Sequence, residues 1–263
     1  MPGSIADGCA MQLTRPVDWV SETKFVVDGL EFGGDLASYT ERTTPERVVI
    51  LKEARLLRQY LDFFAPHATG NIFELGIWQG GSPLFYGLAT DAKKVVALDI
   101  ANPAPPALDA IIARHRLADQ VKLHFGVSQD DRQRVSAIID QDFGGEPIDL
   151  VIDDASHQYG FTRRAFEIVF PRLRPGGFYI IEDWQWAHID SPVYQKGEAF
   201  GGEPALTNFI FELLIVLGGH PGIFENIIVR DWFVAVKKGW WPPERDFRID
   251  DLLRMRGKSL TLI

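Results

Sequence analysis

Five residues in the second half of the chain combine the side-chain types and the spacing of a metal site. They are four carboxylates and one imidazole: Asp153, Asp154, His157, Glu182 and Asp183. Carboxylates gathered in one crevice repel one another unless a cation neutralises them. Oxygen ligands favour a hard divalent cation, and Mg²⁺ is the simplest such ion. We therefore predict that these side chains meet in space around a divalent cation.

Each acidic pair follows a short apolar run that has the composition of a buried β-strand. These runs are residues 148–152 and 178–181, and the apolar pattern of a helix lies between them. Ligands of an open parallel sheet bind outside the carboxyl ends of its strands. The strand–helix–strand unit should therefore bring both acidic pairs to the same edge of the sheet. The alternative is that the first pair caps the following helix and the second lies in a solvated loop.

Strands and helices alternate along most of the remaining sequence. Further strands are expected at 71–76, 94–100 and 121–125, and helices at 44–64, 82–88, before 117, after 130 and at 204–217. Two apolar runs near the end, 224–229 and 232–237, predict a hairpin. This order predicts an α/β protein, a three-layer sandwich whose sheet is parallel except for its last strand.

The first 44 residues differ from the rest of the chain. Glycine and proline recur there and the apolar stretches are brief, so we expect residues 1–44 to form an irregular arm or lid. Residues 45–263 are then expected to form one domain. The alternative for the arm is that Tyr39, Glu41 and Arg42 reach a bound ligand.

A glycine-rich turn follows the strand expected at 71–76 and opens a helix. The candidate ligand-binding residues are Glu74, Gly76, Gly80, Gly81 and Ser82, with Asp99 at the end of the next strand. Glycines let the backbone approach a ligand closely, and an acid at that place suits ribose hydroxyls. The dinucleotide spacing and the phosphate-binding lysine are both missing from this turn. A nucleoside without phosphates, S-adenosylmethionine, fits this pattern.

Polar residues at the ends of two other strands extend the candidate cofactor site. Ser128, Gln129 and Asp130 follow the strand expected at 121–125, where an adenine edge would lie, and we add Asp153 to the set. The Ser-x-Asp spacing is also typical of a helix cap, so this signal alone is weak.

Composition limits the classes of partner. The formal net charge of −9 makes a nucleic-acid backbone an unfavourable partner. The single cysteine, Cys9, precludes an internal disulfide and fits a reducing compartment. The first residues lack a basic leader, and no apolar stretch approaches the ~20 residues of a membrane helix. We expect a soluble, cytoplasmic protein with neither nucleic acid nor membrane as partner.

Four motifs together resemble metal-dependent class I methyltransferases that use S-adenosylmethionine. They are IFELGIWQGGS, the acid in VVALDI, DDASH, and GGFYIIEDWQWAH. The resemblance covers about residues 45–240 and is strongest to macrolide sugar O-methyltransferases of the mycinamicin and macrocin type. It implies a Rossmann-like fold with a seven-stranded sheet. It also implies Mg²⁺ ligands at Asp154, Glu182 and Asp183, and a general base at His157.

The resemblance implies transfer of a methyl group to a hydroxyl of a sugar or another natural-product scaffold. The side chains expected either to line the acceptor pocket or to pack in the core are Trp184, Trp186, His188 and Tyr194. His157 is alternatively a surface residue, in which case His188 is the next candidate base. The acceptor is expected to be a small glycosylated molecule, and the enzyme a homo-oligomer.

Three other classes of function stay open from the sequence. One is a cephalosporin-hydroxylase-like protein with a different reaction, and another is an NAD-dependent enzyme, against which the glycine spacing argues. The third is a protein that binds S-adenosylmethionine without catalysis. The intact set of acids and His157 argues against this third class.

Overall fold

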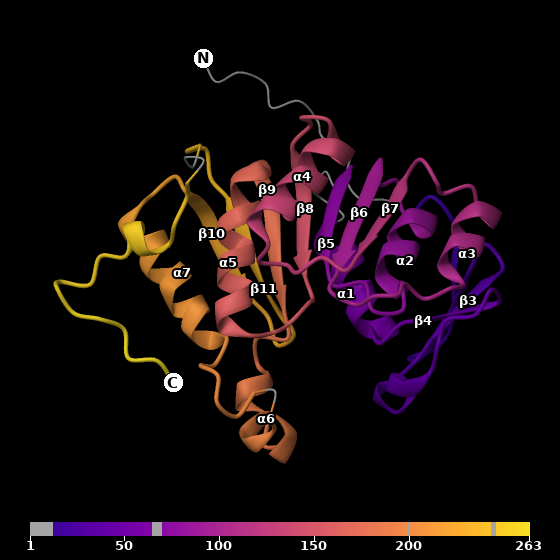
Figure 1. Cartoon of the computed structure of the whole chain (residues 1–263), viewed down its shortest axis with the longest axis horizontal. Coiled ribbons are helices and arrows are strands. Elements are labelled where there is room, and N and C mark those ends of the chain that lie inside the picture. The colour runs from indigo at the N-terminus through magenta and orange to yellow at the C-terminus, as the bar shows by residue number, and fades with distance from the viewer. Residues whose placement is uncertain (1–12, 65–69, 199, 243–245) are drawn as a thin grey trace. The chain divides into compact units, whose positions relative to one another are not determined.

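Strands of the main sheet are short and strongly apolar, as the sequence predicts for buried strands. In the computed structural model they are β5 (Asn71–Leu75), β6 (Lys94–Asp99), β7 (Val121–Phe125), β8 (Ile148–Asp153), β9 (Leu173–Glu182), β10 (Phe224–Val229) and β11 (Phe233–Lys238). The strand order is β10-β11-β9-β8-β5-β6-β7 (Figure 1). Strand β8 pairs with β9 in parallel, whereas β11 is antiparallel to both β9 and β10. The predicted α/β class and the antiparallel last strand are confirmed.

The structure describes residues 13–64, 70–198, 200–242 and 246–263, so Cys9 lies outside the described part. Its helices are α1 (Ala54–Phe64), α2 (Gly81–Ala89), α3 (Leu108–Arg114), α4 (Arg132–Phe143), α5 (Tyr159–Val169), α6 (Pro192–Lys196) and α7 (Thr207–Gly219). None of the described helices is both long enough and apolar enough to cross a membrane.

The chain divides into two compact units. The first comprises Met1–Ile72, Ile77–Ala97 and Ala101–Phe125, and the second comprises Phe73–Gly76, Leu98–Ile100 and Gly126–Ile263. The division into a 1–44 arm and a 45–263 domain stays a prediction.

A second sheet of four strands belongs to the first unit. Its strands, in this order across the sheet, are β1 (Val17–Ser21), β2 (Lys24–Val27), β3 (Leu30–Gly33) and β4 (Arg47–Val49). Phe25 and Phe32 stack on neighbouring strands with ring centroids 5.1 Å apart, and the ring of Phe85 from α2 meets Phe25 edge-on at 5.4 Å. Residues 17–33 are therefore ordered strands, where the sequence predicted an irregular arm.

The helix expected from residue 44 begins at Ala54, because a strand takes its first part. Val48 pairs in parallel with Phe32 of β3, and both side chains are fully buried. Thr44 still caps a turn, since its hydroxyl oxygen accepts a hydrogen bond from the amide of Arg47 at 3.2 Å. Pairing with β3 gives this apolar segment more burial than a solvated first helical turn would.

Three helices of the second unit lie in a row on one face of its strands. Helix α5 packs on β9, α7 packs on β10, and α4 and α7 flank α5 (Figure 1). Phe166 of α5 is central to this layer, with its ring 4.6 Å from Phe170, 4.7 Å from Tyr179 and 5.3 Å from Phe209. This aromatic core fixes the strands β8 and β9, whose ends carry the candidate site.

Candidate metal site and cofactor edge

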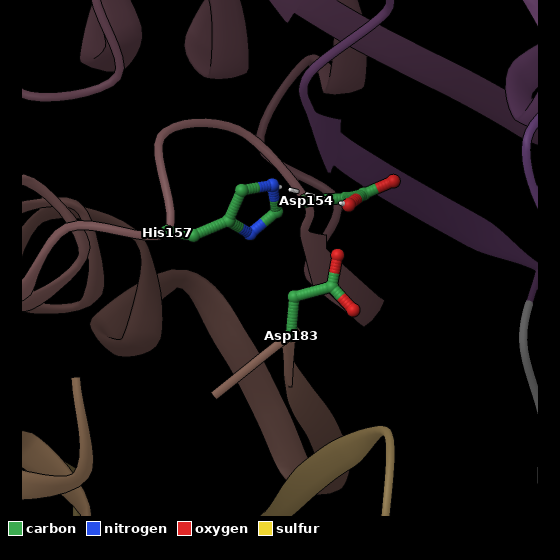
Figure 2. Close-up of side chains that lie close together, drawn as sticks. All are labelled: Asp154, His157 and Asp183. Carbon is green, nitrogen blue, oxygen red and sulfur yellow. Dashed lines mark ion pairs between the residues drawn. The ribbon is translucent and has the colours of Figure 1, made fainter. Parts of the chain in front are cut away.

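Three of the predicted side chains converge in the second unit. One ligand atom from each of Asp154, His157 and Asp183 lies within 4.8 Å of the other two (Figure 2). Asp154 directly follows β8 and Asp183 directly follows β9. Because β8 and β9 are parallel and adjacent, with Asp153 opposite Ile181, their carboxyl ends lie side by side. The sequence prediction that the two acidic clusters meet is thus confirmed for these residues.

Unusual backbone conformations aim two of these side chains. His157 has φ 55° and Asp183 has φ 56°, in the left-handed region that residues other than glycine seldom adopt. Such strain persists only where the surroundings hold it, and it is common at functional sites. The amide of Asp183 donates to the carbonyl of Trp232 at 2.9 Å, and the His157 ring packs 4.2 Å from that of Trp186.

The imidazole of His157 faces the carboxylate of Asp154. Their nearest atoms, Nε2 and Oδ1, are 3.8 Å apart, which is within reach of an ion pair but too far for a hydrogen bond (Figure 2). The His157 side chain is 11% exposed and that of Asp154 25% exposed. The carboxylate of Asp183 points into the same space (Figure 2). The distances between these ligand atoms are short enough for the three groups to share one metal ion.

Glu182 lies outside this cluster. It is the last residue of β9, opposite Phe233 of β11, and is only 4% exposed. Successive side chains of a strand point to opposite faces, so Glu182 and Asp183 do not share a direction. Among the described residues, the candidate cluster has His157 where the sequence placed Glu182. Glu182 as a ligand stays a prediction.

Asp153 is buried and held by hydrogen bonds within the protein. Its carboxylate accepts a bond from the Tyr179 hydroxyl at 2.8 Å and one from Gln129 Nε2 at 3.2 Å. The pKa of Asp153 is raised to about 7, chiefly by burial and to a lesser extent by the charge of Asp154, against the lowering effect of its hydrogen bonds. Gln129 Oε1 in turn accepts from the amide of Ser156 at 3.1 Å. Asp153 and Gln129, predicted as cofactor ligands, therefore tie the end of β8 to the loop that carries Asp154 and His157.

Backbone hydrogen bonds gather the ends of three strands in the second unit. The Gly76 amide donates to Leu98 at 2.8 Å, and the Asp154 amide donates to Leu75 at 2.9 Å. This places Glu74, which is fully buried, and the half-buried Asp99 at one edge with Asp154. The edge is the one that the sequence predicted for the cofactor.

Gly76 is required by packing. Its φ is +100°, and a Cβ atom there would lie 2.2 Å from the Asp154 carbonyl oxygen.

Ser128 and Asp130 form polar contacts with each other and with a neighbouring helix. The Ser128 hydroxyl donates to Asp130 at 2.5 Å, and Asp130 also pairs with Arg164 at 3.0 Å. These are not helix-cap bonds, because the N-cap of α4 is Asp131, whose carboxylate accepts from the Arg134 amide at 3.0 Å. Ser128 and Asp130 as cofactor ligands stay predictions.

The remaining cofactor candidates, Gly80, Gly81 and Ser82, belong to the first unit. Gly80 precedes α2 with φ 86°, and a Cβ atom there would lie 2.4 Å from a methyl group of Leu108. A Cβ atom on Gly81 would lie 2.5 Å from Cβ of Ile50. The turn therefore fits only residues without a side chain at these positions, and Ser82 is buried in the first turn of α2.

An aromatic pocket in the second unit shares His157 and Asp183 with the metal cluster. Its wall includes Trp186, whose ring lies 5.0 Å from Tyr194 and 5.5 Å from Phe200. The sequence singled out Trp186 and Tyr194 as pocket candidates. Phe200 was missed, because a lone aromatic in a loop that contains several glycines gives no periodic signal.

Trp184 and His188 have other polar contacts. Trp184 also lines the pocket, while its ring nitrogen donates to the Arg230 carbonyl at 2.9 Å. His188 is exposed and its Nε2 pairs with the Thr207 hydroxyl. His188 is not part of the described metal cluster, so His157 is the better placed of the two candidate bases.

Residues 73–184 match a protein-family model described as a methyltransferase domain. This stretch contains all three residues of the metal cluster. The match shows that this stretch, which is less than half of the chain, is similar to a methyltransferase domain.

Parts of the chain are also similar to named O-methyltransferases, as its motifs indicated. It is 30% identical over 146 residues to mycinamicin VI 2''-O-methyltransferase from Micromonospora griseorubida, which covers 49% of this chain and 33% of that protein. It is 36% identical over 73 residues to L-olivosyl-oleandolide 3-O-methyltransferase from Streptomyces antibioticus, covering 28% and 18%. The chain thus spans no more than a third of the length of either relative.

A solved structure with a similar arrangement is the MycE methyltransferase in complex with Mg, SAH and mycinamycin VI. The superposition has a TM-score of 0.47 at 21% identity, and covers 78% of this chain and 50% of that one.

Proposed function

We propose that this protein is a divalent-metal-dependent O-methyltransferase. It transfers the methyl group of S-adenosylmethionine to a hydroxyl of a small, glycosylated natural product. The observation that carries the proposal is the convergence of Asp154, His157 and Asp183 at the ends of two parallel strands, within a stretch that matches a methyltransferase domain. The named relatives that methylate antibiotic sugars supply the class of acceptor.

The donor set fits a divalent cation. Two carboxylates and one imidazole offer ligand atoms within 4.8 Å of one another. Asp154 and Asp183 would hold Mg²⁺ through oxygen, the ligand type that this ion prefers. A single imidazole, rather than two, distinguishes this set from the facial triad of non-haem iron oxygenases. When bound, the ion lowers the pKa of a coordinated hydroxyl and fixes its position.

Residues at the strand ends would accept the proton, orient the general base and bind the acceptor during methyl transfer. The acceptor oxygen forms a bond to the methyl carbon as the bond from that carbon to sulfur breaks. The hydroxyl proton would pass to a ring nitrogen of His157, a role that requires the neutral form of the imidazole. The Trp186 ring packed on His157 keeps the imidazole oriented. The pocket lined by Trp186, Tyr194 and Phe200 would hold the acceptor next to these groups, since aromatic faces suit sugar rings.

The predicted cofactor edge also suits S-adenosylmethionine. Asp99 ends β6 and is half-buried, as expected of a carboxylate that accepts ribose hydroxyl groups. The glycine turn before α2 offers backbone amides at a helix N-terminus to the carboxylate of the methionine part. We further propose that the enzyme is homo-oligomeric and cytoplasmic, and that neither nucleic acid nor a membrane is its partner.

Chelation tests the proposed function directly. Protein treated with EDTA should lose transfer of a methyl group from S-adenosylmethionine to glycosylated acceptors, followed as product mass, while its circular dichroism spectrum is unchanged. Added Mg²⁺ should restore the activity. Full turnover after rigorous chelation would contradict the metal-dependent mechanism. Absence of S-adenosylmethionine binding in calorimetry would contradict the proposed reaction as a whole.

A further inference from the structure

Thr43 joins two separate parts of the first unit through three hydrogen bonds. Its amide donates to the side-chain oxygen of Gln79 at 3.0 Å, and its hydroxyl donates to the Gln79 carbonyl at 2.7 Å. The same hydroxyl oxygen accepts from the amide of Val49 in β4 at 3.0 Å. Thr43 and Gln79 are 5% and 7% exposed, so these bonds lie out of solvent. A residue 36 positions earlier in the chain thus fixes both the backbone and the side chain of Gln79.

Gln79 belongs to the turn between β5 and α2 that the proposed function assigns to the cofactor. The residue before it, Trp78, has φ 45°, a left-handed conformation that is unfavourable for an aromatic residue. The ring of Tyr39 stacks on that of Trp78, with centroids 5.7 Å apart and planes at 16°. Gly81, two residues after Gln79, packs against Ile50 at the end of β4. Residues 39–50 therefore enclose the turn of residues 77–81 within the first unit.

We propose that Thr43 is a positioning residue that holds the turn of residues 77–81 in the shape that binds S-adenosylmethionine. This inference rests on the proposed function. A strained turn relaxes when a hydrogen-bonded support is removed, because left-handed residues need their surroundings to over-determine them. The backbone amides that precede α2 would then no longer be aligned for an anionic group. The segment before the methyltransferase match would thereby contribute to cofactor affinity without any contact with the acceptor.

Thr90 provides a matched control in the same unit. It is 3% exposed, its hydroxyl donates to the Tyr86 carbonyl at 2.7 Å, and its oxygen accepts from the Ala92 amide at 3.2 Å. It lies at the C-terminal end of α2, whereas the turn precedes the N-terminal end. Thr43→Val and Thr90→Val each remove a buried hydroxyl that makes one donated and one accepted bond. Their effects on stability should therefore be similar.

The test compares the affinity of S-adenosylmethionine in these variants by calorimetry, together with Tm and with Mn²⁺ affinity as a probe of the metal cluster. Thr43→Val should raise Kd for S-adenosylmethionine about tenfold with unchanged Mn²⁺ affinity, and Thr43→Ser should restore the wild-type value. Thr90→Val should lower Tm comparably and leave Kd unchanged. Equal Kd values in Thr43→Val and the wild type would overturn the inference.

A second substitution that removes fewer hydrogen bonds keeps the inference testable if Thr43→Val does not fold. Gln79→Leu removes only the side-chain bond to the Thr43 amide and leaves the bond from the Thr43 hydroxyl to the Gln79 carbonyl. It should raise Kd in the same direction by a smaller factor, and an unchanged Kd would overturn the inference. Loss of binding in the wild type would instead refute the proposed function, so the two failures are distinguishable.

Discussion

The position of His157 fits two different roles, that of a general base and that of a metal ligand. Its Nε2 lies 3.8 Å from Asp154, close enough for the imidazole either to receive a proton or to act as a third metal ligand. The two roles differ in what happens to the metal when the side chain is removed. A base can be lost while the ion stays bound, whereas a ligand cannot.

Substitution of His157 by alanine should lower kcat about 10²-fold or more, because the proton of the acceptor hydroxyl then has no nearby acceptor. Mn²⁺ affinity should stay close to that of the wild type. Asp154→Asn is the matched comparison and should weaken Mn²⁺ binding itself. The measurements are steady-state kinetics and metal titration by electron paramagnetic resonance. Loss of metal in His157→Ala would assign His157 to the ligand set, and wild-type kcat would move the role of base to another residue.

At the scale of elements, Lys238 connects the end of β11 to the segment that precedes and begins β9. Its ammonium donates to the Pro171 carbonyl at 2.9 Å and to the Leu173 carbonyl at 2.5 Å, and the residue is 4% exposed. Burial lowers the pKa of Lys238 from 10.5 to about 8. The folded state therefore disfavours the charged form, although two carbonyls partly compensate it.

The stability of the wild type relative to Lys238→Met should consequently rise with pH. Below pH 8 the lysine is charged in both states, and the folded protein bears the full cost of burying that charge. Between pH 8 and 10.5 the folded state releases the proton while the unfolded state keeps it, so this cost is progressively relieved. Urea unfolding of both proteins from pH 7 to 10 measures the difference. A difference independent of pH would show that the lysine is solvated.

For the whole molecule, the clustered acids couple metal binding to stability. Asp154 and Asp183 lie together at the strand ends, and each is only partly exposed. A cation that binds this arrangement and not the unfolded chain stabilises the fold according to its concentration and affinity.

Mg²⁺ should therefore raise Tm, with a stabilisation of about 2.7 kcal/mol when the ion is present at one hundred times its Kd. The measurement is differential scanning calorimetry at constant ionic strength, with Na⁺ replacing Mg²⁺ in the reference. Asp154→Asn should show little of this increase. An equal increase in that variant would mean that the ion acts elsewhere on the protein.

The sequence by itself determined those features of the fold and of the site that follow from local hydrophobic pattern. Apolar runs such as 148–152 gave the strands of the main sheet, and the acids after them marked the edge at which ligands bind. The parallel pairing of β8 and β9 then follows from the helix between them. That is enough to place Asp154, His157 and Asp183 near one another before any coordinates are known.

Tertiary structure alone decided the parts that depend on contacts distant in sequence. Val48 lies in a strand because it pairs with the buried Phe32 of β3. The hydrophobic pattern around Val48 is equally compatible with a helix. Asp183 belongs to the candidate metal cluster, and its left-handed backbone and its amide bond to Trp232 orient it there. The hydrogen bonds between Thr43 and Gln79 join residues 36 positions apart, so the local hydrophobic periodicity of the sequence does not predict them. Hydrophobic pattern records which face of an element is buried, whereas side-chain direction at an element's end is set by whatever packs against it.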